Sequence, residues 1–243
     1  MCGIVGIYLK NKKLSKDLGK YLTGMMQGMA TRGPDSAGFA IYSENKKAKE
    51  YKYSVCLLNN YPFNTFKKII TKKFNKLKLK QHSDHVILTS DSDPKKIVSF
   101  ISTELKEVSL VGYGKSIEIF KQVGNPNDVI KNFQLYKFSG THAIGHTRMA
   151  TESAITTNGS HPYSTGQDEC LVHNGSLSNH NNLRRKLLKQ GQSFDSENDT
   201  EVAAGYVSNS LSNKKSLKET LVNGLKDLDG FYTFITGTRE GFA

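Results

Sequence analysis

The sequence predicts a layered α+β fold because two kinds of apolar segment alternate along its 243 residues. Short segments rich in β-branched and aromatic residues, such as 2–8 and 230–236, are typical of buried strands. A longer segment, 14–28, repeats apolar residues at helical spacing, as Leu18, Leu22 and Met26 illustrate. Both kinds of segment must bury an apolar face, and stacked layers of sheet and helix achieve this.

Composition favours a globular protein of the cytoplasm. Hydrophobic residues make up 37% of the chain, and no apolar run reaches the roughly 18 residues that a membrane helix needs. The first apolar run precedes the basic residues 10–13, which is the reverse of the order in a signal peptide. The three cysteines are scattered without a Cys-x-x-Cys pair, so we expect neither a disulfide framework nor a metal site.

The net charge of +12 arises largely from lysines between residues 67 and 80. Such a run usually forms a solvated face, and no nucleic-acid-binding motif accompanies it. We therefore expect no nucleic-acid partner and no membrane partner. We expect these lysines to form a docking face for an acidic protein partner instead.

Patterns along the first half predict alternating strands and helices. We expect strands at 2–8, 39–42, 51–58, 85–88, 110–112 and 116–123, and helices at 14–28, 63–74, 93–105 and 126–133. The turn at 32–38 carries more polar groups than a turn requires, so Arg32 and Asp35 are candidate walls of a site. Residues from about 44 to 139 carry no catalytic pattern. We interpret them as a lysine-rich insertion in a single domain spanning 1–243.

The second half predicts a strand leading to Arg148, strands at 169–173 and 230–236, and helices at 179–190, after 201, and at 216–225. The planar guanidinium of Arg148 suits a carboxylate clamp. Asn174-Gly175 is either a hairpin tip or a donor pair for an oxyanion, and His173 and Cys170 are expected to be structural. The chain ends as a further hairpin strand begins, so we expect the domain to be C-terminally incomplete.

Cys2 is the candidate nucleophile. If Met1 is removed, Cys2 carries a thiol and a free α-amine whose ordinary pKa, about 7.7–8.0, suits a general base near neutral pH. Gly3 permits close backbone approach, and Ile4 and Val5 begin a strand that would anchor the terminus.

Together these motifs resemble the class II glutamine amidotransferases, which use an N-terminal nucleophile. The resemblance rests on Met-Cys-Gly-Ile-Val-Gly at the start, Arg-Gly-Pro-Asp-Ser-Ala-Gly at 32–38, Gly-His-Thr-Arg-Met-Ala-Thr at 145–151, His-Asn-Gly at 173–175 and Glu-Asn-Asp-Thr-Glu at 197–201. It covers residues 1–43 and about 140–243. The run at 173–185 most resembles the stand-alone amidotransferase subunit of glutamate-synthase-like enzymes, of the N-methylglutamate synthase type.

The resemblance implies a four-layer αββα fold with two stacked antiparallel sheets, and hydrolysis of L-glutamine to glutamate and ammonia through a Cys2 thioester. It assigns oxyanion stabilisation to Asn174 and Gly175. It assigns the substrate pocket to Arg148, Thr151, Gly175 and Asp199, with Arg148 on the carboxylate and Asp199 on the ammonium. Arg32 and Asp35 would support the nucleophile. It implies no cofactor in this chain and a synthase subunit that accepts the ammonia.

Two departures affect the choice of pathway. Met149 and Glu152 stand where glucosamine-phosphate-forming relatives carry an aromatic residue and a histidine, which weakens a sugar-aminating assignment. The alternatives are an amidotransferase for purine or amino-sugar synthesis, an N-terminal-nucleophile hydrolase of another amide, and a non-catalytic subunit that keeps the fold. The intact set of Cys2, Arg148, Asn174, Gly175 and Asp199 argues against the last.

Overall fold

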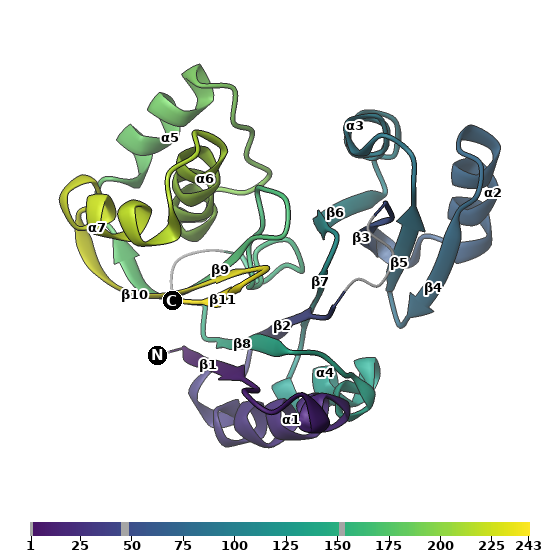
Figure 1. Ribbon diagram of the computed structural model, residues 1–243, viewed down its shortest axis with the longest axis horizontal. Helices are drawn as coiled ribbons and strands as arrows, with labels where there is room; N and C mark the ends of the chain where they lie inside the picture. The colour runs from purple at the N-terminus through teal and green to yellow at the C-terminus, as the bar shows by residue number, and fades with distance from the viewer. Residues whose placement is uncertain (1, 45–48, 151–153) are drawn as a thin grey trace.

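The computed structural model describes residues 2–44, 49–150 and 154–243, whose strands form three antiparallel sheets (Figure 1). Two of the sheets face each other and carry the motifs described above at their edges. The third lies to one side with its own helices. The first two sheets position the site.

The first sheet has the strand order β1-β8-β2-β7. Its strands are β1 (Gly3–Tyr8), β8 (His142–Arg148), β2 (Ser36–Tyr42) and β7 (Ile117–Val123). Helices α1 (Leu18–Gly28) and α4 (Pro126–Phe133) cover its outer face. Leu22 and Met26 of α1 are fully buried in the same cluster as Phe39 of β2, as their helical spacing predicts.

The second sheet has the order β11-β10-β9. Its strands are β11 (Gly241–Phe242), β10 (Gly230–Thr238) and β9 (Cys170–Leu177), and its outer face carries α5 (His180–Lys189), α6 (Asp199–Ser212) and α7 (Leu217–Asp227). Ser216 and Glu219 form a reciprocal capping box that starts α7. β11 is the further hairpin strand expected at the end of the sequence.

A shared core joins the inner faces of these two sheets. Tyr42 and Ile144 of the first sheet are buried in one cluster with Cys170 and Val172 of the second. Helices therefore lie outside two stacked sheets, and the expected four-layer αββα fold is confirmed.

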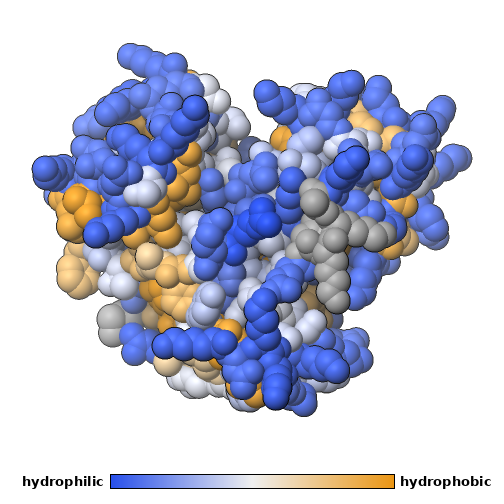
Figure 2. Space-filling model, viewed as in Figure 1, coloured by the Kyte–Doolittle hydropathy of each residue, from blue (hydrophilic) through white to orange (hydrophobic). Residues whose placement is uncertain are grey.

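The third sheet forms an accessory layer, which we define as residues 51–114. It has the order β4-β5-β3-β6, with strands β3 (Tyr51–Leu57), β4 (Lys78–His82), β5 (His85–Ser90) and β6 (Val108–Gly114) and helices α2 (Phe63–Lys73) and α3 (Pro94–Glu104). Val55, Phe66 and Ile97 belong to its separate core. The lysines of α2 are exposed, and hydrophilic side chains cover much of the accessory layer (Figure 2).

The accessory layer is shorter than the insertion expected at about 44–139. Strand β7 pairs with β2 along its whole length, from Ser36 opposite Val123 to Tyr42 opposite Ile117, and α4 packs on the first sheet. These two elements therefore complete the first sheet. Strand β4 was absent from the expectation because its lysine-rich, largely exposed residues lack an apolar alternation.

Short 3₁₀ segments complete the secondary structure: η1 (Lys12–Asp17), η2 (Ala30–Arg32), η3 (Leu58–Asn60) and η4 (Leu135–Lys137). The helix expected at 14–28 thus begins as a 3₁₀ turn and becomes α-helical at Leu18. Within 2–44, 49–150 and 154–243, no helix is long and apolar enough to cross a membrane.

Candidate active site

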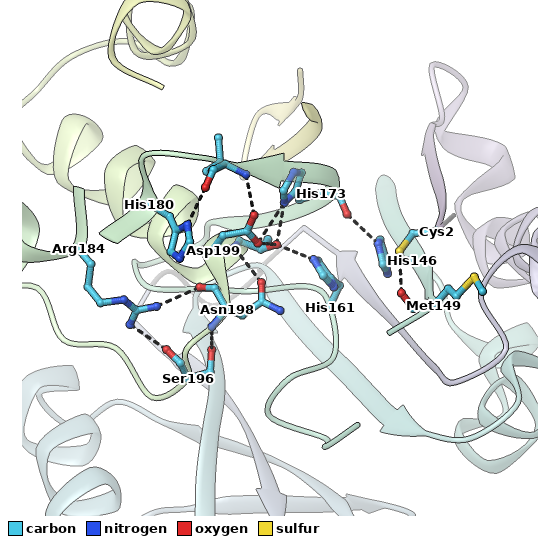
Figure 3. Close-up of polar contacts among 12 residues, drawn as sticks. Cys2, His146, Met149, His161, His173, His180, Arg184, Ser196, Asn198 and Asp199 are labelled. Atoms are coloured by element: carbon cyan, nitrogen blue, oxygen red, sulfur yellow. Dashed lines mark hydrogen bonds and ion pairs between the residues drawn. The ribbon is translucent and has the colours of Figure 1, made fainter. Parts of the chain in front are cut away.

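Strand pairing places Cys2 beside the end of β8. Cys2 directly precedes β1, whose Gly3 lies opposite Thr147, and the Cys2 thiol donates a weak hydrogen bond to the Met149 carbonyl at 3.8 Å (Figure 3). A Cβ at Gly3 would lie 2.6 Å from both Met29 Cβ and Thr147 Oγ1. Because residue 3 is glycine and has no Cβ, the backbone next to Cys2 can pack directly against Met29 and Thr147.

Arg32 and Asp35 support this corner from the turn before β2. Arg32 Nε donates to the Cys2 carbonyl at 3.4 Å. Asp35 accepts from the Ala150 N–H through Oδ2 at 2.8 Å and donates its own N–H to the Arg148 carbonyl at 3.0 Å. The two residues thus hold Cys2 and the segment after β8 in place.

Asn174 reaches the same corner from the second sheet. Its Nδ2 donates to the Cys2 carbonyl at 3.5 Å, across 172 positions of sequence. Asn174 and Gly175 lie inside β9, paired with Thr233 and Tyr232 of β10, so the alternative of a hairpin tip is wrong. Gly175 has φ of +136°, and a Cβ there would lie 2.0 Å from the Phe231 carbonyl oxygen, so this strand position requires glycine.

Arg148 ends β8 and is buried, with 4% of its surface exposed. Its Nη1 donates to the Ala154 carbonyl at 3.3 Å. A guanidinium is a planar group with five N–H donors, the geometry that binds a carboxylate through two parallel hydrogen bonds. Thr151, the other residue expected here, lies outside the described residues, as does Glu152.

Asp199 is the first residue of α6, a position at which an acidic side chain usually points into solvent. The cap is instead Asn198, whose side chain accepts from the Thr200 N–H. Asp199 Oδ2 accepts from the Leu177 N–H at 2.8 Å, and Oδ1 lies 3.6 Å from His173 Nδ1. Burial alone would raise the pKa of this carboxyl, but the hydrogen bonds from His173 and the Leu177 N–H outweigh burial and lower it. Asp199 is therefore a carboxylate at neutral pH.

A buried histidine network links Asp199 to the oxyanion candidates. His146 Nε2 donates to the His173 carbonyl at 3.0 Å, next to Asn174. His173 Nδ1 and His161 Nε2 both contact the Thr200 hydroxyl, at 2.9 and 3.0 Å. The rings of His146 and His161 stack with centroids 3.9 Å apart. The structural role expected for His173 thus extends to contacting Asp199 and Thr200 of α6 from the strand that also carries Asn174 (Figure 3).

His146 and His161 of this network are uncharged at neutral pH. Burial lowers the pKa of His146 to about 3 and lowers that of His161 well below its ordinary value. Because a carbonyl accepts from His146 Nε2, that nitrogen carries the proton. Neutral rings can hold the strand and helix ends without repelling Arg148.

Lys121 of β7 fixes the loop that follows Arg148. Its buried Nζ donates to the carbonyls of Asn158 and Ser160, at 3.1 and 2.8 Å, and lies 4.5 Å from the centre of the Tyr163 ring. Burial lowers its pKa to about 8. The loop held in this way leads directly into His161.

Sequence reasoning missed His146, His161, Thr200 and Lys121 as contributors. His146 and Thr200 stand inside the Gly-His-Thr-Arg and Asp-Thr-Glu motifs, so their motif positions were a usable signal. His161 and Lys121 become neighbours of the site only through the pairing of β2 with both β7 and β8. No sequence spacing indicates that contact.

Comparison with known proteins agrees with this geometry. A family model described as a glutamine amidotransferase domain matches residues 146–241. The chain is 45% identical to the glutamine amidotransferase-like protein GlxB of Rhizobium meliloti, covering 100% of this chain and 81% of that protein. It is 32% identical to a putative glutamine amidotransferase of Methanothermobacter thermautotrophicus, covering 99% of this chain and 83% of that protein.

Solved structures agree at the level of the fold. The glutamine phosphoribosylpyrophosphate amidotransferase from B. subtilis matches 98% of this chain and 35% of its own, with a TM-score of 0.58 and 19% sequence identity. Combined with the relatives above, this shows that the chain belongs to the class II, N-terminal-nucleophile glutamine amidotransferases, a family of enzymes.

Proposed function

We propose that this chain hydrolyses L-glutamine to glutamate and ammonia through a thioester on Cys2. The observation that carries the proposal is the convergence of Arg32 and Asn174 on the Cys2 carbonyl, Arg32 from the turn before β2 and Asn174 from β9 of the second sheet. The nucleophile's own residue is thereby held against the side chain offered as an oxyanion donor. A subunit that kept only its fold would gain nothing from this arrangement.

The chemistry follows from the groups at this corner once Met1 is removed. The Cys2 α-amine accepts the thiol proton while Sγ adds to the amide carbon of glutamine. The Asn174 amide and the Gly175 N–H stabilise the oxyanion that forms. The carbon–nitrogen bond then breaks, the amine returns the proton to the leaving ammonia, and water hydrolyses the thioester to glutamate.

Arg148 and Asp199 supply specificity for a free amino acid in this proposal. The guanidinium would clamp the α-carboxylate and the ionised Asp199 would hold the α-ammonium, with Thr151 and Gly175 lining the same pocket. Hydrogen bonds already orient both charged groups, so little ordering remains to be done when the substrate binds.

The ammonia would pass to a synthase partner of the glutamate-synthase type. The run at 173–185 supports this partner, and Met149 argues against amino-sugar synthesis. The chain nevertheless shares 33% identity over 57% of its length with a glutamine–fructose-6-phosphate aminotransferase of Buchnera aphidicola, which keeps amino-sugar synthesis as the second candidate. To distinguish the two pathways, fructose-6-phosphate and a glutamate-synthase-type subunit are added in separate assays. The addition that increases the rate of glutamine hydrolysis identifies the pathway.

Glutamine-dependent ammonia release tests the hydrolysis itself. We expect release by the chain lacking Met1, its loss in Cys2→Ala, and no release from asparagine. The matched control is Cys170→Ser, which alters a buried thiol within the shared core. Release that survives Cys2→Ala, or equal turnover of asparagine, would contradict the proposal. Ammonia release seen only when the synthase partner is present would support the proposed chemistry and show that the partner completes the active site.

A further inference from the structure

A second group of chemically reactive side chains lies away from Cys2, where the accessory layer meets the first sheet. Cys56 of β3 and His85 of β5 are paired across neighbouring strands, and Asp84 directly precedes His85. Their potential ligand atoms all lie within 4.8 Å of one another. We propose that Cys56, Asp84 and His85 bind a zinc-type divalent cation.

The donor set suits zinc. A thiolate, an imidazole nitrogen and a carboxylate oxygen are the ligands that zinc selects, at about 2.0–2.3 Å each. Tetrahedral bonds of that length separate ligand atoms by about 3.3–3.8 Å, so a small inward shift closes the site. Thiolate and carboxylate together neutralise the dication, which permits its burial.

Burial and backbone pairing hold the ligands in place. Cys56 and His85 are 1% and 0% exposed, and the Leu57 N–H donates to the Asp84 carbonyl at 2.8 Å. His85 Nδ1 faces Asp84 Oδ1 at 2.9 Å, and zinc would take the place of the proton between them.

The surroundings orient these ligands as outer partners do in metal sites. Gln122 of β7 donates to Asp84 Oδ2 at 3.0 Å, and Asn132 of α4 donates to Gln122 Oε1 at 2.9 Å. All three ligands belong to the accessory layer, and the hydrogen bond from Gln122 ties Asp84 to the first sheet as well.

A hollow gives the site access to solvent. It has a volume of about 810 Å³ and is lined by Cys56 and Asp84, by 154 and 156–159 of the loop after β8, and by 195–198 before α6. Figure 2 shows a notch with mainly hydrophilic walls between the helices of the second sheet and the accessory layer. Water or a ligand can therefore occupy the fourth coordination position that three protein ligands leave open.

The sequence expectation of no zinc site rested on cysteine spacing. Here one cysteine joins a histidine 29 positions later through strand pairing, which no Cys-x-x-Cys search detects. The pairing of β3 with β5 is thus the feature that creates the site.

Cobalt substitution tests the site with a readout independent of glutamine hydrolysis. The full-length chain carrying Cys2→Ala is treated with a chelator, dialysed and titrated with Co²⁺, so that Cys56 and Cys170 are its remaining thiols. We expect a thiolate-to-cobalt absorption band that saturates at one equivalent, and its displacement by Zn²⁺. We expect the band to vanish on Cys56→Ser and to persist on Cys170→Ser.

The variant Asp84→Asn tests whether loss of Co²⁺ binding reflects loss of a ligand rather than unfolding, because the asparagine side chain can still accept the hydrogen bond from Gln122. We expect it to keep the native circular dichroism spectrum and to weaken Co²⁺ binding at least about tenfold. Absence of a thiolate band in the parent chain, or an unchanged band after Cys56→Ser, would overturn the proposal. Because Cys2 is absent throughout, neither result bears on the proposed hydrolysis.

Discussion

The side-chain amide of Asn174 in β9 donates to the Cys2 carbonyl, and in the proposed mechanism the same amide stabilises the oxyanion. We expect Asn174→Ala to lower kcat for glutamine hydrolysis roughly 10²–10³-fold, as loss of one oxyanion donor does elsewhere. KM should change little, because the donor acts on the charge that develops in the transition state. Steady-state ammonia release measures both. Asn181→Ala, on the exposed surface of α5, is the control, and an equal loss there would refute the role.

Gly175 acts through its backbone. We expect Gly175→Ala to reduce the free energy of unfolding by roughly 1–3 kcal/mol, because alanine resists the positive φ and its Cβ would meet the Phe231 carbonyl. Gly28→Ala is the matched control, since its Cβ would meet nothing within 4 Å. Urea denaturation compares the two. Equal stability of both variants would contradict the strand geometry described for Gly175.

At the scale of single elements, strand β7 carries Lys121, whose buried ammonium donates to the carbonyls of the loop after β8. The pKa of Lys121 is about 8 in the folded chain and 10.5 ordinarily, so between these values the unfolded chain binds the extra proton. We therefore expect the free energy of unfolding to rise with pH across this window, by about 1.4 kcal/mol per pH unit. Lys121→Met should remove that rise. Denaturation curves recorded for both proteins at several alkaline pH values supply the comparison, and parallel pH profiles would contradict the assignment.

The histidine network that joins β8, β9 and α6 acts on stability in the acidic pH range, with the same sign as Lys121. His146 and His161 are held neutral, whereas the unfolded chain protonates them near pH 6.5. Acidification below about pH 6.5 should thus destabilise the fold by up to about 1.4 kcal/mol per pH unit for each ring, down to about pH 3 for His146. His146→Gln, whose amide can still donate to the His173 carbonyl, should show a shallower decline. An unchanged slope would mean that this ring does not resist protonation.

The sequence largely predicts which segments are helices and which are strands, but it does not predict which strands pair with each other. The spacing of Leu18, Leu22 and Met26 predicts α1 because one buried face is enough to produce that period. The polar, exposed β4 carries no such period and was missed. The boundary of the insertion depended on whether β7 pairs with β2 or with the accessory layer, and a local pattern does not report a partner strand.

At the scale of the whole molecule, two stacked sheets bring together residues from both ends of the chain. Motif resemblance predicted Cys2, Arg32, Asp35 and Asn174 as neighbours, and the structure places these four around one corner. The residues that pack behind Cys2 and Asn174 were not predictable in the same way. His161, Thr200 and Lys121 meet there because the loop after β8 folds between β7 and α6, which only long-range packing determines.

The covalent state of the N-terminal residue tests the central claim most directly. The chain is incubated with a glutamine analogue that carries an electrophilic carbon in place of the side-chain amide, and its peptides are then analysed by mass spectrometry. We predict a single adduct on Cys2 with Met1 absent, prevented by excess glutamine and unaffected by asparagine. Retention of Met1 in active protein, or labelling of Cys56 or Cys170 while Cys2 stays free, would contradict the account.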